Sequence, residues 1–222
     1  MEDSGIPEEK GMGACEGDVV KEMEAMDLNL SSKSAKIVDL LRRFLGVQQR
    51  RAKAYASWHR GFAEYMAHGE EMAYQQLCAE ITTEFNDCSK EVLEMESLFL
   101  MPETSRSDLA CLLKEVQVQE KQKLHLTAKI QILKKAGRPS ERLVSHESCR
   151  SGNETKHECR HVREITEADG TLDAEADAEY ERSLKEAIRG VQDAVTSINE
   201  HLEEVRYEIE ELCPGSFCGT VI

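Results

Sequence analysis

Long apolar runs, aromatic residues and prolines are all scarce in this sequence. Only 5% of its 222 residues are aromatic, with a single tryptophan, and only four are prolines. Few aromatic side chains argue against a thick globular core, since large rings supply much of the volume that fills one. No apolar stretch approaches the roughly 20 residues that a membrane-spanning helix needs. We therefore expect thin layers of helices and no membrane span.

The amino-terminal sequence also lacks targeting signals. The segment MEDSGIPEEK is acidic and has no apolar stretch like that of a signal peptide. Position two is not the glycine that myristoylation requires. We therefore expect a protein of the nucleus, the cytoplasm or both, neither secreted nor bound to a membrane. Thiols stay reduced in those compartments, so the eight cysteines do not indicate a disulfide framework.

Charge is abundant but uneven. The formal net charge is −15, which argues against non-specific binding of the polyanionic nucleic acids. Residues 33–60 nevertheless hold eight lysines and arginines and one acid, Asp39. Residues 173–211 show the reverse bias, with thirteen acids and four basic residues. A basic first segment and an acidic last one are therefore expected.

Four segments show the period of amphipathic helices, with apolar residues recurring at steps of three and four. They span residues 37–65, 74–99, 109–133 and 184–212. The first stripe includes polar as well as apolar residues. It consists of Ile37, Leu41, Phe44, Gln48, Arg51, Tyr55, Trp58, Phe62 and Tyr65. The third stripe is Leu109, Leu112, Val116, Gln119, Lys123, Leu126, Ile130 and Leu133. The fourth keeps heptad spacing: Leu184, Ile188, Val191, Val195, Ile198, Leu202, Val205, Ile209 and Leu212.

The fold class that follows is all-α, and strand signals are absent. Short breaks at 67–71 and 100–105 favour antiparallel neighbours, so we predict an elongated bundle of about four long amphipathic helices with coiled-coil-like seams. The expected organisation, in chain order, is a disordered acidic tail (1–33), a three-helix antiparallel region (34–136), an irregular connector (137–170), a long carboxy-terminal heptad helix (171–213) and a flexible tail (214–222).

The basic stretch of the first helix is the main candidate for binding a partner. Its arginines are Arg42, Arg43, Arg50 and Arg51, with Tyr55, Trp58 and Phe62 interleaved. Basic and aromatic residues together can contact nucleic acid. The aromatic residues share the spacing of the buried stripe, however, and the net charge is strongly negative. We therefore place pairing with the acidic last helix or with another protein ahead of direct nucleic-acid binding.

One constellation has residues that could ligate zinc. His146 and Cys149 are followed by His157, Cys159 and His161. Imidazole nitrogen and thiolate sulfur are the usual zinc ligands. The spacing matches no common zinc finger, so the preferred interpretation is an exposed polar connector with no cofactor.

Catalytic motifs are missing. There is no glycine-rich phosphate loop, nucleophile elbow or His-Glu-x-x-His helix. We therefore expect no enzymatic activity. The final residues, Thr220-Val221-Ile222, fit the carboxy-terminal pattern that adds as a strand to PDZ domains, although three residues also suit a free tail.

Three segments resemble a known family. They are Leu41-Arg-Arg-Phe-Leu with Tyr55-x-x-Trp58-His-Arg-Gly-Phe62, then Gly137-Arg-Pro-Ser-Glu-Arg-Leu143, and finally Ser197-Ile-Asn-Glu-His-Leu-Glu-Glu-Val-Arg-Tyr-Glu-Ile209. Together they resemble the Required for Excision B-type family over roughly residues 35–212. The resemblance implies a helical protein linked to DNA repair, with no catalytic residue to transfer. Asn199 and Tyr207 are polar positions on the last helix that could fix its register or contact a partner.

Two functional hypotheses follow. The first is a non-catalytic accessory protein of DNA repair that acts through contacts with other proteins. The alternative is a general coiled-coil scaffold or adaptor of a cytoplasmic assembly. The oligomeric state is open in both, and the heptad pattern of the last helix allows a dimer.

Overall fold

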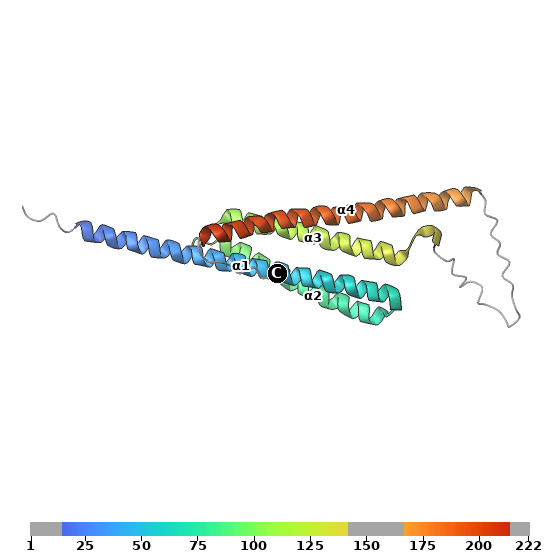
Figure 1. The fold of residues 1–222 in the computed structure, drawn as a ribbon, viewed down its shortest axis with the longest axis horizontal. Helices are drawn as coiled ribbons and strands as arrows, with labels where there is room; N and C mark the ends of the chain where they lie inside the picture. The colour runs from blue at the N-terminus through green and yellow to red at the C-terminus, as the bar shows by residue number, and fades with distance from the viewer. Residues whose placement is uncertain (1–14, 142–166, 214–222) are drawn as a thin grey trace, which may run out of the picture.

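The computed structural model describes residues 15–141 and 167–213, and Figure 1 shows their arrangement. The long helices are α1 (Cys15–His68), α2 (Glu71–Phe99), α3 (Ser107–Ala136) and α4 (Glu167–Leu212), with the short 3-10 helix η1 at Pro139–Glu141. No strand occurs among these described residues. The predicted all-α bundle of long helices is therefore confirmed.

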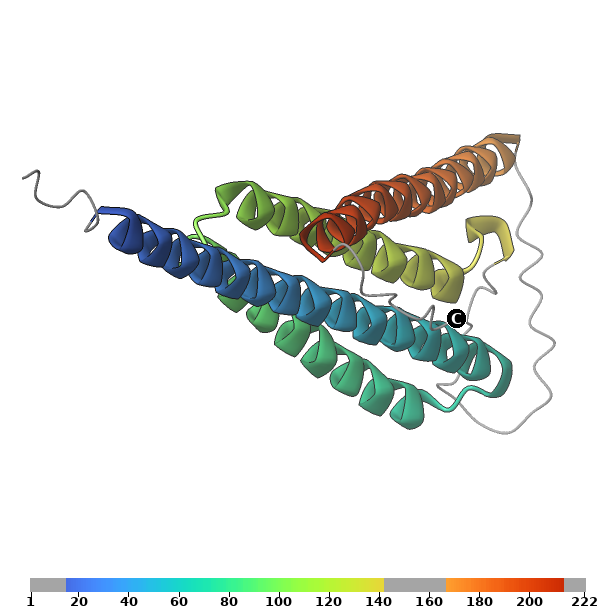
Figure 2. The ribbon, with the colours of Figure 1, turned by 60° about the vertical axis from the view of Figure 1, so that its left-hand side comes forward.

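The helices form two antiparallel hairpins, α1 with α2 and α3 with α4. The two hairpins come together where α2 leads into α3. Toward the α1–α2 turn α4 moves away from α1, as Figures 1 and 2 show, whereas α3 stays in contact with α2. The amino-terminal part of α1 extends past the other helices. The bundle therefore has a closed end with four helices and an open end where α4 leaves α1.

The closed end holds the larger core. All four long helices contribute a side chain with no exposed surface, namely Phe44, Val92, Leu113 and Val205. Burying each such side chain stabilises the fold by about 1.5–3 kcal/mol. This core joins the two hairpins and fixes the place of α4.

The open end has a smaller, more aromatic core built from α1, α2 and α3. Tyr55 and Trp58 of α1 pack with Ile81 and Phe85 of α2, and Leu124 of α3 covers them. The Tyr55 and Phe85 ring centroids lie 4.7 Å apart, a distance at which aromatic pairs attract. The first three helices thus remain packed where α4 diverges.

The first half of helix α4 packs against α3 through small residues of α4 and not through its largest apolar side chains. Ala187 and Ala194 are buried, and a side-chain carbon added to Gly190 would lie 2.6 Å from Cδ1 of Leu126. Ile188, a member of the predicted heptad stripe, is 40% exposed. Small residues let two helix backbones approach closely, so the seam here lies on Ala187, Gly190 and Ala194, beside the predicted stripe.

Helix α3 buries two faces. Leu113 and Val116 point into the core shared with α1 and α2, whereas Leu126 contacts α4. The single predicted stripe therefore mixed residues of both faces. Polar residues complete the face toward α1 and α2, because Glu120, Thr127 and Gln131 are buried there.

The predicted helix ends agree at the glycines. Gly69 has φ +73° and Gly137 has φ +69°, conformations that favour glycine after a last helical turn. Ser105 and Asp108 have the spacing of a capping box, but none forms. Arg106 occupies the cap position without a side-chain cap, and the Asp108 carboxylate instead accepts hydrogen bonds from the Arg106 guanidinium.

The first helix begins at Cys15, whereas the sequence predicted its start near Ser34, so residues 15–33 of the expected disordered tail are helical. About half of this stretch is Glu, Met, Leu, Lys and Ala, and it contains no proline. Such residues have high helix propensity, and extending an existing helix costs far less than nucleating one. None of the described helices is long and apolar enough to cross a membrane.

Candidate functional site

A buried arginine lies at the centre of the packing between α1, α2 and α3. Arg51 of α1 is 2% exposed. Its guanidinium donates hydrogen bonds to the Gln117 side-chain oxygen of α3 and to Ser89 Oγ of α2, the latter at 3.3 Å. Gln117 in turn donates to the Ser89 carbonyl at 3.2 Å. One side chain of α1 thus joins α2 and α3.

The charge that balances Arg51 comes from Glu120 of α3, which is 6% exposed. With its amide nitrogen toward Glu120, Gln48 donates to Glu120 Oε1 and accepts from Arg51, both at 3.0 Å. Lys123 Nζ lies 3.7 Å from the same carboxylate and 3.9 Å from the centre of the Tyr55 ring. We call Gln48, Arg51, Gln117, Glu120 and Lys123 the polar layer.

Burial shapes the ionisation of the layer. Desolvation lowers the pKa of Arg51 and of Lys123, and the Glu120 carboxylate opposes both shifts. Desolvation, reinforced by the nearby Glu120, also raises the pKa of Tyr55. An arginine remains protonated in proteins, so the layer keeps a buried cation next to its carboxylate. A buried charge of this kind favours the one helix register that pairs it.

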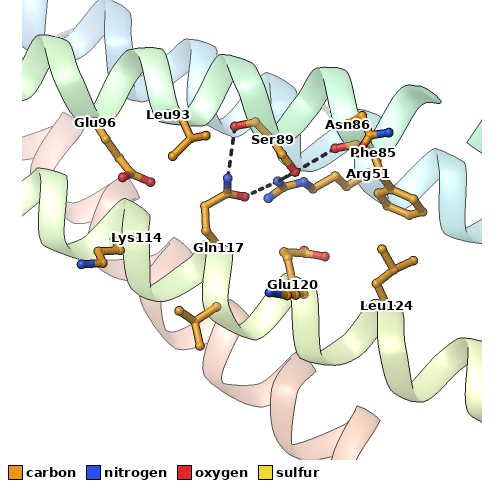
Figure 3. Close-up of a pocket in the computed structure, with 12 residues that line it drawn as sticks. Arg51, Phe85, Asn86, Ser89, Leu93, Glu96, Lys114, Gln117, Glu120 and Leu124 are labelled. Carbon is orange, nitrogen blue, oxygen red and sulfur yellow. Dashed lines mark hydrogen bonds between the residues drawn. The ribbon is translucent and has the colours of Figure 1, made fainter. Parts of the chain in front are cut away.

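Three members of the polar layer, Arg51, Gln117 and Glu120, line a cavity of about 540 Å³ between α2 and α3. Figure 3 shows Gln117, Glu120 and Leu124 of α3 facing Ser89 and Phe85 of α2, with Arg51 between them. A smaller cavity of about 100 Å³ continues it past Phe85 and Leu124. We call the two together the α2–α3 groove.

The mouth of the groove combines apolar and charged side chains. Leu93 of α2 and Val118 of α3 line it and are 55% and 56% exposed. Glu96, Lys114 and Lys121 line it as well. Glu96 Oε1 and Glu120 Oε2 are buried and have no hydrogen-bond partner among the described residues. Buried polar atoms normally have a partner, so the groove has two acceptors that lack a donor.

The four predicted arginines fall into different environments. Arg42 and Arg43 are exposed. Arg50 forms ion pairs with Glu84, at 2.8 Å, and with Glu91, both on α2. Arg50 and Arg51 therefore pair with α2 and α3, and neither pairs with the acidic last helix as the sequence had suggested. The arginines that do so are Arg106, which lies 2.5 Å from Glu208, and Arg138, which forms an ion pair with Glu181.

The two polar positions predicted on α4 are both open to solvent. Asn199 is exposed, and Tyr207 is 69% exposed. They share no cluster with the predicted arginines. The carboxy-terminal half of the heptad stripe of α4, with Ile198, Val205 and Ile209, packs within the chain, and a dimer through this helix stays a prediction.

The zinc candidates His146, Cys149, His157, Cys159 and His161 lie outside the described residues, as do Thr220, Val221 and Ile222. Within residues 15–141 and 167–213, no group of three or more His, Cys, Asp or Glu side chains could hold a metal ion.

A histidine links α4 to α3 at the closed end. His201 Nε2 lies 2.8 Å from Glu115 Oε2, and Nδ1 lies 2.6 Å from the Ser197 carbonyl. Both ring nitrogens can donate only in the protonated form. Burial alone lowers the pKa of His201, but the bonds to Ser197 and Glu115 outweigh it and raise the pKa above its ordinary value.

This pair should make stability depend on pH. Because the pKa of His201 is higher in the folded state, its protonation stabilises the fold. This stabilisation is complete below the unfolded-state pKa of about 6.5 and is lost as the pH rises through the folded-state pKa. Replacing Glu115 with Gln should therefore cost about 0.5–1 kcal/mol at pH 6 and much less at pH 9. Urea unfolding at both pH values checks this, and an equal cost at both would contradict it.

These features define a helical bundle with a buried polar layer and an open groove. The model of the family described as DNA repair REX1-B matches residues 39–134. This match supports the DNA repair family that the sequence resembles, across most of α1, all of α2 and nearly all of α3. The two resembling segments at 137–143 and 197–209 lie outside the match. Neither the curated proteins nor the solved structures gave a match.

Proposed function

We propose that the protein is a non-catalytic accessory factor of DNA repair that acts by binding other proteins through its helical surfaces. The observation that carries the proposal is the family match over residues 39–134. That region contains the polar layer and both walls of the α2–α3 groove. A shared sequence pattern there points to the three-helix unit as the working part of the protein.

The distribution of charge supports protein partners over nucleic acid. The net charge is −15, and the arginines Arg50 and Arg51 are engaged within the bundle. The exposed cations of α1 without an ion-pair partner among the described residues are Lys36, Arg42, Arg43, Lys53 and Arg60. The strongly negative net charge disfavours a phosphate backbone, so acidic side chains of a partner protein suit these cations better. We place the protein in the nucleus, the cytoplasm or both.

Loss of the protein should make cells hypersensitive to DNA damage. The test compares survival of cells with and without the protein after ultraviolet, alkylating and crosslinking treatments. Re-expression of the intact chain should restore survival, because the accessory role would be restored with it. Normal survival of the deficient cells under all three treatments would contradict the proposal.

Partner capture completes the test. Affinity capture of the tagged chain, followed by mass spectrometry, should recover repair or chromatin proteins. Charge reversal of Arg42 and Arg43 to Glu should remove those that bind this surface of α1, and reversal of Lys185, which is exposed on α4, serves as the matched control. A consistent set of unrelated cytoplasmic partners would instead favour a general scaffold.

A further inference from the structure

We propose that the α2–α3 groove binds one amphipathic helix of a partner protein, whose apolar stripe covers Leu93 and Val118 and whose hydrogen-bond donors reach Glu96 and Glu120. This inference rests on the proposed function, because it names the surface and the kind of partner through which an accessory protein would act. A helix laid in a groove between two helices is a common mode of recognition, and it uses anchors on successive turns.

The apolar part of the groove is the first reason. Leu93 and Val118 leave more than half of their surface open to solvent, on opposite walls of the cavity. Phe85 and Leu124 continue the apolar lining inward. A partner helix with apolar residues at steps of three and four would cover both walls at once and remove this surface from water.

The two acceptors without donors are the second reason. Glu120 is buried, its Oε2 atom has no partner among the described residues, and it lines the cavity. Arg51 and Lys123 already supply positive charge nearby, so a neutral amide or hydroxyl of the partner suffices there. Glu96 Oε1 is equally without a donor, and burial raises the Glu96 pKa. A partner cation at Glu96 would offset that desolvation.

The helix geometry sets the spacing of the two donors. Gln117 lies level with Ser89, since its amide bonds the Ser89 carbonyl. Glu96 is seven residues farther along α2, and Glu120 is three residues farther along the antiparallel α3. Because the two helices are antiparallel, these steps lead in opposite directions along the groove. At about 1.5 Å per residue they separate Glu96 from Glu120 by roughly 15 Å. The partner helix should therefore carry its cation and its neutral donor about ten residues apart.

The lysines at the mouth complete the pattern. Lys114 and Lys121 both line the groove from α3. Acidic residues flanking the apolar stripe of the partner would face them. A nucleic acid offers neither an apolar stripe nor a cation for Glu96, so the groove suits a protein helix and not a phosphate backbone.

The test uses a displayed library of 18-residue helical peptides, selected on the full chain. Selected peptides should share an apolar stripe, with Lys or Arg about ten positions from Asn, Gln, Ser or Thr. Fluorescence anisotropy should show binding weakened about tenfold or more, roughly 1.4 kcal/mol or more, by Val118→Glu and by Glu96→Lys. Ile132→Glu is the matched control, because Ile132 is 68% exposed on the same helix and lies outside the groove.

Three results would overturn the inference. The first is that no peptide binds the full chain in preference to the Val118→Glu chain. The second is that Ile132→Glu weakens peptide binding as much as Val118→Glu does. The third is that duplex DNA binds and competes with the peptides. Circular dichroism of each variant shows that the helices are intact.

Cell survival separates this inference from the proposed function. If deficient cells are hypersensitive and Val118→Glu restores survival as fully as Ile132→Glu does, the repair role stands and the groove is not its partner site. If deficient cells survive normally, the proposed function fails whatever the peptides do.

Discussion

Replacing Arg51 with alanine should lower the free energy of unfolding by about 3–5 kcal/mol. Arg51 is 2% exposed and binds Gln117 and Ser89, so its loss leaves their polar atoms without a donor. Glu120 would also lose its nearest buried cation on α1. Glu120 is linked to Arg51 through Gln48, and removing the cation is costly because the carboxylate stays desolvated. Urea unfolding followed by the fluorescence of Trp58 measures the change.

Two further variants make this prediction specific. The triple change Arg51→Met, Glu120→Met and Lys123→Met removes all three charges of the polar layer and should recover more than half of the loss, because apolar side chains of similar volume need no partner. Arg43→Ala is the matched single control, since Arg43 is exposed on the same helix, and its effect should stay within about 0.5 kcal/mol. An Arg51→Ala cost below about 1 kcal/mol would show that the layer contributes little to stability.

Replacing Val205 with aspartate should destabilise the protein by about 3–5 kcal/mol, the cost of an uncompensated buried charge. Val205 has no exposed surface and packs in the closed-end core with residues of the other three helices. A carboxylate there should release the carboxy-terminal half of α4 from the bundle. Hydrogen exchange along α4 and urea unfolding together measure the loss.

Ile188→Asp is the matched control for this second prediction. The sequence places Ile188 and Val205 on the same heptad stripe, yet Ile188 is 40% exposed. Its replacement should cost less than about 1 kcal/mol. Equal effects of the two substitutions would mean that α4 packs on its predicted stripe along its whole length.

The first two helices show what sequence periodicity predicts well. Every residue of the first stripe from Ile37 to Phe62 is buried, including the polar Gln48 and Arg51. Each of these helices buries mainly one face, so a regular period of three and four residues identifies it. The same pattern predicts that Arg51 is buried, because Arg51 lies on the stripe. Its charge led to a surface interpretation instead.

The last two helices show where periodicity is insufficient. Helix α3 packs on both sides, so Leu113 and Glu120 lie next to the predicted stripe and were missed. Helix α4 contacts α3 through Ala187 and Ala194, which a search for large apolar residues passes over. Burial of small residues depends on how closely two backbones approach, and that distance is a property of the assembled bundle. The α2–α3 groove depends on which face α3 turns toward α2, and it was therefore not predicted.

Because α4 is the last of the four long helices in the chain, the ribosome synthesises it after the other three helices. The closed-end core is complete only when Val205 and Ile209 have been made, whereas the aromatic core of α1, α2 and α3 needs nothing beyond Ala136. From Gly137 to Leu212 there are 76 residues, which a ribosome adds in roughly 4–15 seconds at 5–20 residues per second. During that interval Leu41, Leu113 and Val116 belong to an unfinished apolar surface on the nascent chain. Such surfaces are where chaperones bind and where neighbouring nascent chains associate.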